Sequence, residues 1–304
     1  MLGGAGLLGA CVVWALAAAP TLPAPPPGGP APLAVGWGRV KATGTVTAVN
    51  ESSHTVTLAI AGSARVDEFE GGSAWRQKAL AGTRLARLLS ATLIVDSAHR
   101  PITAAEVRVG DLSTVWGVVQ PDETILALAF QVSSPRFPQA AWRSPAALTG
   151  GPVGVVLDRS GSVLDMLTSA GTRRSVVMTA ATAIRSGGQT APGLGPAPAP
   201  YDILRIEGPV NSDGSIAATR IEVEFAASTA AQVSGPVEWS EAEVGGLVVG
   251  GTMIVASTET YIVERATLAR FADLAPRRPI TVYGAAVRAG ETPIGLHARV
   301  VLAR

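Results

Sequence analysis

The sequence predicts an all-β fold built as three small five-stranded barrels in tandem after an N-terminal hydrophobic leader. Three observations predict it. Hydrophobic residues make up 47% of the 304-residue chain and charged residues 15%, so most of the chain should fold. Short runs of alternating apolar residues are separated by turn residues about every eight to twelve positions. Finally, the same ordered set of segments occurs three times along the chain.

Each repeat opens with a predicted hairpin, continues into a middle strand and ends in a second hairpin. The opening hairpins occupy 43–62, 149–171 and 233–251, and the middle strands 91–97, 173–184 and 252–263. The closing hairpins occupy 112–134, 203–225 and 280–303. A glycine stands inside the first strand of each closing hairpin, at Gly117, Gly208 and Gly284. Glycine weakens a strand interior, so its recurrence at one place predicts a bend or bulge of the kind that closes a small barrel.

These segments divide the chain into a leader and three units. The predicted boundaries are 1–33 for the leader with its tether, 34–145 for the first barrel, 146–229 for the second and 230–304 for the third. The first barrel carries an insertion at 63–90, and 135–145 and 226–232 are predicted linkers. The alternative is that a composition rich in Val, Ala and Gly makes unrelated segments look alike. The fixed order of the segments favours three related units.

Residues 1–33 are predicted to be a signal peptide or membrane anchor followed by a Pro/Gly-rich tether. The uncharged run at 6–20 contains a small-residue site at Ala17–Ala19 and is shorter than the roughly 20 residues that span a bilayer. It lacks the Lys or Arg usual before such a run. An uncleaved anchor, a lipoprotein and a buried N-terminal helix are the alternatives. For the lipoprotein, Leu8–Cys11 resembles a lipobox and Cys11 is the candidate lipidation residue. We expect an extracytoplasmic protein, secreted or tethered to the membrane.

The unit pattern resembles the DUF5666 family of small bacterial β-barrel domains of unknown function. The Gly-x-Val openings at 44–46, 151–153 and 235–237 carry the resemblance, with Thr182 and Thr260 and the endings of the closing hairpins. The first unit departs from the pattern by its insertion. The second lacks the Gly-Asp step that 107–112 supplies in the first. The resemblance implies an OB-like five-stranded barrel and an extracytoplasmic setting, and it supplies no catalytic residues.

The best candidate for a helix is 73–91, within the insertion of the first barrel. Ser73 is its candidate cap, and one stripe of the cylinder would hold Trp75, Leu85, Leu88 and Leu89. We expect this helix to cover the open end of its barrel. A basic amphipathic helix that lies on an anionic membrane or an acidic partner is the alternative.

The sequence offers little reactive chemistry. Asp67, Glu68 and Glu70 lie together without a recognised acid/base or Ca²⁺ spacing, so we expect a solvated loop. His54, His99 and His297 are far apart and are expected to be exposed or simply hydrogen-bonded. With Cys11 as the only cysteine, neither a disulfide nor a His/Cys metal site is expected, and no cofactor is implied.

The net charge of +1 gives no general attraction to nucleic acid, and aromatic residues at 5% are sparse for a single-strand binder. The sequence therefore predicts a non-enzymatic binding or structural module of the cell envelope, with envelope proteins or cell-wall components as partners. A small-ligand binder or an enzyme with a site between barrels, near 63–90 or 185–202, is the alternative. A structural module tethered by an uncleaved leader is a third possibility.

Overall fold

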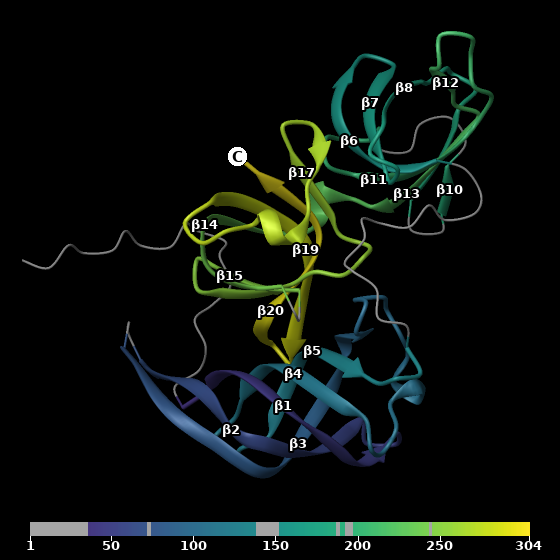
Figure 1. Cartoon of the computed structure of the whole chain (residues 1–304). Helices are drawn as coiled ribbons and strands as arrows, with labels where there is room; N and C mark the ends of the chain where they lie inside the picture. Colours follow the sequence, from purple (N-terminus) through teal and green to yellow (C-terminus); the bar gives the residue numbers. More distant parts are fainter. Residues whose placement is uncertain (1–35, 72–73, 138–151, 187–188, 192–196, 243–244) are drawn as a thin grey trace, which may run out of the picture.

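The computed structural model shows an all-β protein (Figure 1). The described parts contain β-strands and short 3₁₀ turns, and no α-helix occurs among them. The predicted leader, with Ala17–Ala19 and the candidate lipidation residue Cys11, lies outside the described residues. The structure describes residues 36–71, 74–137, 152–186, 189–191, 197–242 and 245–304.

The first unit is a closed barrel whose strands follow the order β1-β2-β3-β5-β4, with β4 paired back to β1. Alternate side chains of each strand point inward, so Val40, Leu58 and Phe130 lie in one apolar core. The period-two pattern of the sequence thus becomes an inner and an outer face. The strands are β1 (Gly38–Asn50), β2 (Thr55–Gly71), β3 (Ala74–Asp96), β4 (Leu112–Val119) and β5 (Ile125–Ser133), with η1 (Ala104–Glu106) before β4.

The second unit is an eight-stranded sheet in the order β10-β9-β13-β11-β6-β7-β8-β12, rather than the predicted five-stranded barrel. The count differs for two reasons. The middle and last strands are each interrupted and re-enter the sheet as a separate strand, which gives seven strands, and β10 adds an eighth beside β9. The strands are β6 (Val153–Ser160), β7 (Val163–Thr168), β8 (Arg173–Val177), β9 (Ala183–Ser186), β10 (Gln189–Ala191), β11 (Ile203–Glu207), β12 (Ile216–Ala217) and β13 (Arg220–Phe225).

The third unit is a seven-stranded sheet in the order β16-β15-β14-β19-β20-β17-β18. An additional pairing joins β16 to β20, so five of its strands make a closed circuit of pairings. The unit follows η2 (Ala227–Thr229). Its elements are β14 (Ala231–Glu241), β15 (Gly246–Val249), β16 (Thr252–Val255), β17 (Tyr261–Glu264), β18 (Thr267–Leu268), η3 (Phe271–Asp273), β19 (Pro279–Ala289) and β20 (Thr292–Ala303).

Parallel pairing between the middle and the last strand occurs in all three units, each time in two segments. In the first unit β3 pairs with β5 on both sides of a register shift between Leu88 and Leu93. In the second, β8 pairs with β12 and β9 with β13. In the third, β16 and then β17 pair with successive parts of β20. The repeat seen in the sequence therefore corresponds to a repeated pattern of strand pairing.

One threonine bridges the interruption of the middle strand in each unit. Its hydroxyl donates to a carbonyl of the last strand and accepts the backbone N–H of the residue three positions earlier. Because the hydroxyl satisfies two backbone groups at once, the chain can leave the sheet without stranding them in the core. The donated bonds are Thr92 to Ala127 (2.6 Å), Thr182 to Ala218 (2.7 Å) and Thr260 to Ala298 (2.8 Å), and the accepted ones come from Leu89 (2.7 Å), Thr179 (2.8 Å) and Ser257 (3.0 Å).

The three mid-strand glycines share one environment. A Cβ at Gly117, Gly208 or Gly284 would lie 2.0, 2.0 or 2.1 Å from a carbonyl oxygen of the paired last strand. Real side chains do not approach backbone oxygen so closely, so the strand can take this path only with glycine. The pairing register also shifts at Gly117 and at Gly284. Each glycine therefore stands where two neighbouring strands come into unusually close contact.

The predicted helix at 73–91 is wrong, because this segment belongs to β3 and pairs antiparallel with β2 along most of its length. Leu80, Ala86 and Leu88 point into the barrel core, whereas Leu85 is 40% exposed. A helical stripe and a strand face can share the same leucines over a short segment. Here the continuous partner strand β2 decides the outcome in favour of a strand. The insertion thus extends a hairpin of the barrel. Ser73 and the side chain of Trp75 lie outside the described residues.

The third unit lies between the other two and packs against both (Figure 1). Its contact with the first unit is an apolar cluster that includes Trp116 and Leu128 on one side and Met253 and Ile294 on the other. Its contact with the second unit includes Tyr201, whose ring stacks on Tyr283 with a 5.5 Å centroid separation. Two buried apolar interfaces therefore join the units into one body.

The structure describes only part of the predicted linkers. Residues 138–145 lie outside it, while 226–232 contain η2 and the start of β14. Within this second linker, the backbone N–H of Ala227 donates to the Asp202 carboxylate at 2.8 Å. The connection between the second and third units is therefore held by a buried hydrogen bond rather than left as a free tether.

Replacement of Thr260 by valine should lower the free energy of unfolding by about 1–3 kcal/mol, because the Ala298 carbonyl and the Ser257 N–H would remain buried without a partner. Urea denaturation monitored by circular dichroism measures this loss. Thr260→Ser keeps the hydroxyl and should retain most of the stability. Thr267→Val is the matched control, because it removes an exposed hydroxyl contact in the same unit. Equal losses of unfolding free energy for Thr260→Val and Thr267→Val would contradict the prediction, because the buried hydroxyl would then stabilise the fold no more than the exposed one.

Candidate binding cleft between the first and third units

A cleft of about 470 Å³ opens where the outer face of the first barrel meets the third unit. It has both charged and aromatic walls, and it includes Arg65 and Asp67 from the 63–90 region in which the sequence analysis placed one candidate site. The sequence did not predict that Arg65 and Asp67 lie beside the third unit. The lining residues are Arg39, Val40, Lys41, Arg65, Asp67, Trp116, Glu238, Trp239 and Val248.

Strand register sets the charged wall of the cleft. On β1 the even-numbered Val40 and Ala42 point into the barrel core, so Arg39 and Lys41 point outward. Lys41 is the cross-strand partner of Arg65 on β2, and Arg39 is the partner of Asp67. Alternation on two paired strands therefore gathers three cations and one carboxylate on one patch of the barrel surface.

Carboxylates of both units balance these cations. Two like charges directly across a strand pair repel each other, as Lys41 and Arg65 do. Lys41 Nζ lies 3.1 Å from a carboxylate oxygen of Glu241, which belongs to β14 of the third unit. Arg65 Nε lies 3.5 Å from Asp67 Oδ1 within the first unit. The ion pair between Lys41 and Glu241 also connects the two units across the cleft.

The guanidinium of Arg39 is partly enclosed in the cleft. Burial lowers the pKa of Arg39, and the nearby carboxylates of Glu238 and Asp67 oppose that shift. Glu238 is held in turn by the backbone N–H of Gly251, which donates to its Oε1 at 2.8 Å. An arginine in such a setting stays protonated and offers planar, directional donors.

Two tryptophans from different units form the aromatic wall. The rings of Trp116 on β4 and Trp239 on β14 meet edge to face, with centroids 5.2 Å apart and planes at 67°. Trp116 is 3% exposed and lies against Gly246, where an added Cβ would be 1.5 Å from the ring. Trp239 remains 37% exposed. A buried ring thus supports a second ring that faces solvent.

The carboxylates that the sequence analysis assigned to a solvated loop belong to strand β2 instead. They form ion pairs because β2 pairs with β3 in a long hairpin. Arg76 Nη2 lies 3.1 Å from Glu68 Oε1, and Arg76 Nε lies 3.4 Å from Glu70 Oε1. Asp67 alone of the three lines the cleft.

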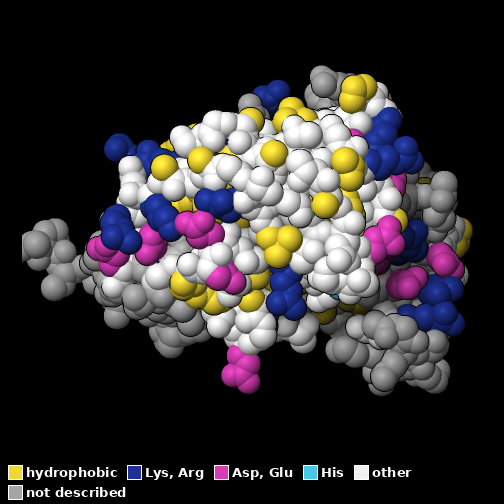
Figure 2. Space-filling model, turned by 90° about the horizontal axis from the view of Figure 1, so that it is seen from below, with side chains coloured by type: hydrophobic (Ala, Val, Ile, Leu, Met, Phe, Trp, Pro, Cys, Tyr) yellow, Lys and Arg dark blue, Asp and Glu magenta, His cyan; other side chains and the backbone are white. Residues whose placement is uncertain are grey.

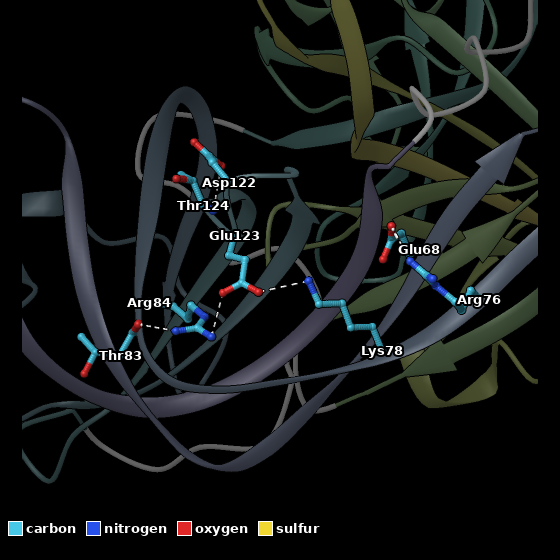
Figure 3. Close-up of polar contacts among 8 residues, drawn as sticks. All are labelled: Glu68, Arg76, Lys78, Thr83, Arg84, Asp122, Glu123 and Thr124. Carbon is cyan, nitrogen blue, oxygen red and sulfur yellow. Dashed lines mark hydrogen bonds and ion pairs between the residues drawn. The ribbon is translucent and has the colours of Figure 1, made fainter.

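A second charged group lies on the same barrel, where Lys78 and Arg84 both contact Glu123 at 3.0 and 2.8 Å (Figure 3). The hydrogen bond from Lys78, followed by the charge of Arg84, lowers the pKa of Glu123. Figure 2 shows acidic and basic side chains next to each other on the face that it presents. The charges of this surface therefore form pairs of opposite sign and not a field of one sign.

None of the three histidines lines the cleft. His54 is exposed at a turn, as expected. His99 is 6% exposed, and its carbonyl accepts the backbone N–H of Thr258 from the third unit at 3.2 Å. His297 lies on β20, where burial and then the charge of Arg299 lower its pKa to about 4.

The described residues contain neither a cluster of metal-ligating side chains nor a membrane-spanning helix. Among them, no group of three or more His, Cys, Asp or Glu side chains is placed to hold a metal ion. None of the helical turns in this part of the chain is long and apolar enough to cross a membrane.

Comparison with known proteins identifies one domain. The model of DUF5666, a domain of unknown function, matches residues 167–222, within the second unit. The solved structure of drosophila Unr CSD456 aligns with 90% of this chain and 98% of its own at 10% identity, with a TM-score of 0.18, which carries no argument about fold or function. No curated protein sequence matches the chain.

The depressed pKa of His297 predicts acid sensitivity. Above pH 6.5 the imidazole is neutral in both states; as the pH falls towards 4, the unfolded chain takes up the proton first, and up to about 3 kcal/mol of stability is lost. Urea midpoints between pH 7 and pH 4 measure this loss. His297→Gln should be less sensitive over this window, with a native circular dichroism spectrum at pH 7. Parallel curves for the two proteins would contradict the prediction.

Proposed function

We propose, from the premise that the chain carries a DUF5666 domain at 167–222, that this protein is a non-enzymatic binding module of the bacterial cell envelope. It is exported by its hydrophobic leader, and it recognises an envelope component at the cleft between the first and third units. The observation that carries the proposal is this cleft, which combines aromatic and charged side chains of two units.

Rigid coupling of the units supports a binding role. A site assembled from two units keeps its geometry only if those units are fixed to each other. Buried apolar contacts of Trp116 and Val118 with Val248 and Met253, together with the ion pair of Lys41 and Glu241, supply this fixation. The ligand therefore meets a preformed cleft and the ordering cost of binding stays small.

We also infer that each unit is a variant of one OB-like five-stranded barrel. The common pairing of middle and last strands, the recurring threonine bridge and the glycine contacts support this finer description. In this view β9–β10 and β17–β18 are extensions of the middle strand beyond its interruption. Three copies of one barrel would explain why the closing segments of the sequence look alike.

An enzyme or small-ligand binder at the same cleft is the second candidate. Asp67 and Glu238 both line it, and paired carboxylates are one arrangement for acid–base chemistry. The binding module is preferred because both carboxylates are already engaged. Asp67 lies near Arg65 and Arg39. Glu238 lies near Arg39 and accepts a hydrogen bond from the Gly251 N–H.

Two measurements on the full-length chain test the proposal. After cell fractionation, the protein should appear outside the cytoplasm, and Cys11→Ser tests lipidation by its effect on membrane association. Purified protein should then retain a component of envelope extract, and Arg65→Glu should reduce that capture severalfold, because Arg65 lines the cleft with a largely exposed side chain. Arg174→Glu, an exposed arginine on β8 of the second unit, is the matched control. A cytoplasmic protein, or equal capture by both variants, would contradict the proposal.

A further inference from the structure

We propose that the cleft between the first and third units binds a neutral glycan, with Trp239 as the platform on which a sugar ring stacks. This inference rests on the proposed function and specifies the chemical class of its ligand. It is carried by three properties of the cleft: its size, its balanced charges and its supported aromatic surface.

The size of the cleft suits a short oligosaccharide. Its volume of about 470 Å³ lies in the ordinary range of small-molecule sites, roughly 300–1,000 Å³. Its walls come from different units, with Arg39, Lys41, Arg65 and Asp67 on one side and Glu238 and Trp239 on the other. A ligand placed there contacts both units at once.

The charges of the cleft favour a ligand without net charge. Each cation has a carboxylate nearby: Glu241 beside Lys41, Asp67 beside Arg65, and Glu238 and Asp67 beside Arg39. A polyanion would have to compete with these carboxylates and would gain little from the overall field. Arginine, lysine and carboxylate groups together offer donors and acceptors within one small space, which is what the hydroxyl groups of a sugar require, since each both donates and accepts.

The aromatic wall supplies the apolar half of the recognition. A sugar ring carries its C–H groups on one face and its hydroxyl groups around its edge, so it pairs a flat apolar surface with polar rim groups. Trp239 presents a partly exposed indole, whose flat apolar face can pack against the C–H face of a sugar ring. Its edge-to-face contact with Trp116 fixes its orientation, and Trp116 is fixed in turn against Gly246. The platform is therefore in place before the ligand arrives.

Titration of the full-length protein with chitotetraose, cellotetraose and maltotetraose tests the inference, by isothermal calorimetry and by tryptophan fluorescence. We expect at least one sugar to bind, with a change in tryptophan emission and little dependence on salt. Trp239→Ala should weaken binding roughly tenfold or more, whereas Trp239→Phe, which keeps an aromatic face, should lose much less. Leu112→Ala removes another exposed apolar side chain, on β4 outside the cleft, and should bind as the parent does.

Other outcomes separate the ligand class from the proposed function. Failure of all three sugars to bind overturns the inference, as does tighter, salt-sensitive binding of heparin or binding of an acidic peptide. If envelope capture still depends on Arg65 in that case, the cleft is a binding site for another class of ligand and the proposed function stands. If envelope capture does not depend on Arg65 either, both the glycan inference and the proposed function are wrong. Shortening of a bound sugar would support the ligand class and overturn the non-enzymatic role.

Discussion

The parallel pairing of the middle strand with the last strand is the constraint on which the rest of the structure depends. The two strands are far apart in the sequence, and only this contact completes the circuit of the first and third units. It is interrupted in every unit, and the interruption is tolerated because one threonine hydroxyl satisfies a backbone donor and a backbone acceptor at the break. The last strand pairs on its other edge with the strand that carries the mid-strand glycine. There the glycine permits a close approach of the two backbones. These small residues give each unit its curvature.

Strand alternation determines which side chains face outward, and apolar packing determines where the units meet. On the first barrel the inward residues of β1 form the core, which leaves Arg39 and Lys41 on the outer face beside Arg65 and Asp67. On the third unit a register shift between Val237 and Trp239 interrupts the alternation of β14, and both Glu238 and Trp239 line the cleft. The apolar cluster around Trp116 and Met253 then brings the two faces together. The cleft is a product of packing between repeats, and its charged residues are balanced by partners from both units.

Repetition accounts for the architecture, and departures from repetition account for the site. The threonine bridge and the glycine contact occur in all three units, so they carry no information about a ligand. Among the described strands, the long hairpin of β2 and β3, which provides Arg65 and Asp67, belongs to the first unit. The aromatic residues that line the cleft are Trp116 of the first unit and Trp239 of the third. A binding role therefore falls on features that distinguish one copy from another.

The sequence by itself determined the all-β class, the order of the segments in each repeat and the glycines that lie at close backbone contacts, because strand alternation and turn residues are local properties. It did not determine the state of residues 73–91, whose leucines satisfy a helix and a strand equally well until β2 pairs beside them. Nor did it place Lys41 beside Glu241 or Trp116 beside Trp239, or show that His99 is buried and that burial lowers the pKa of His297. Those contacts join residues distant in sequence, and only the packing of one unit on another decides them.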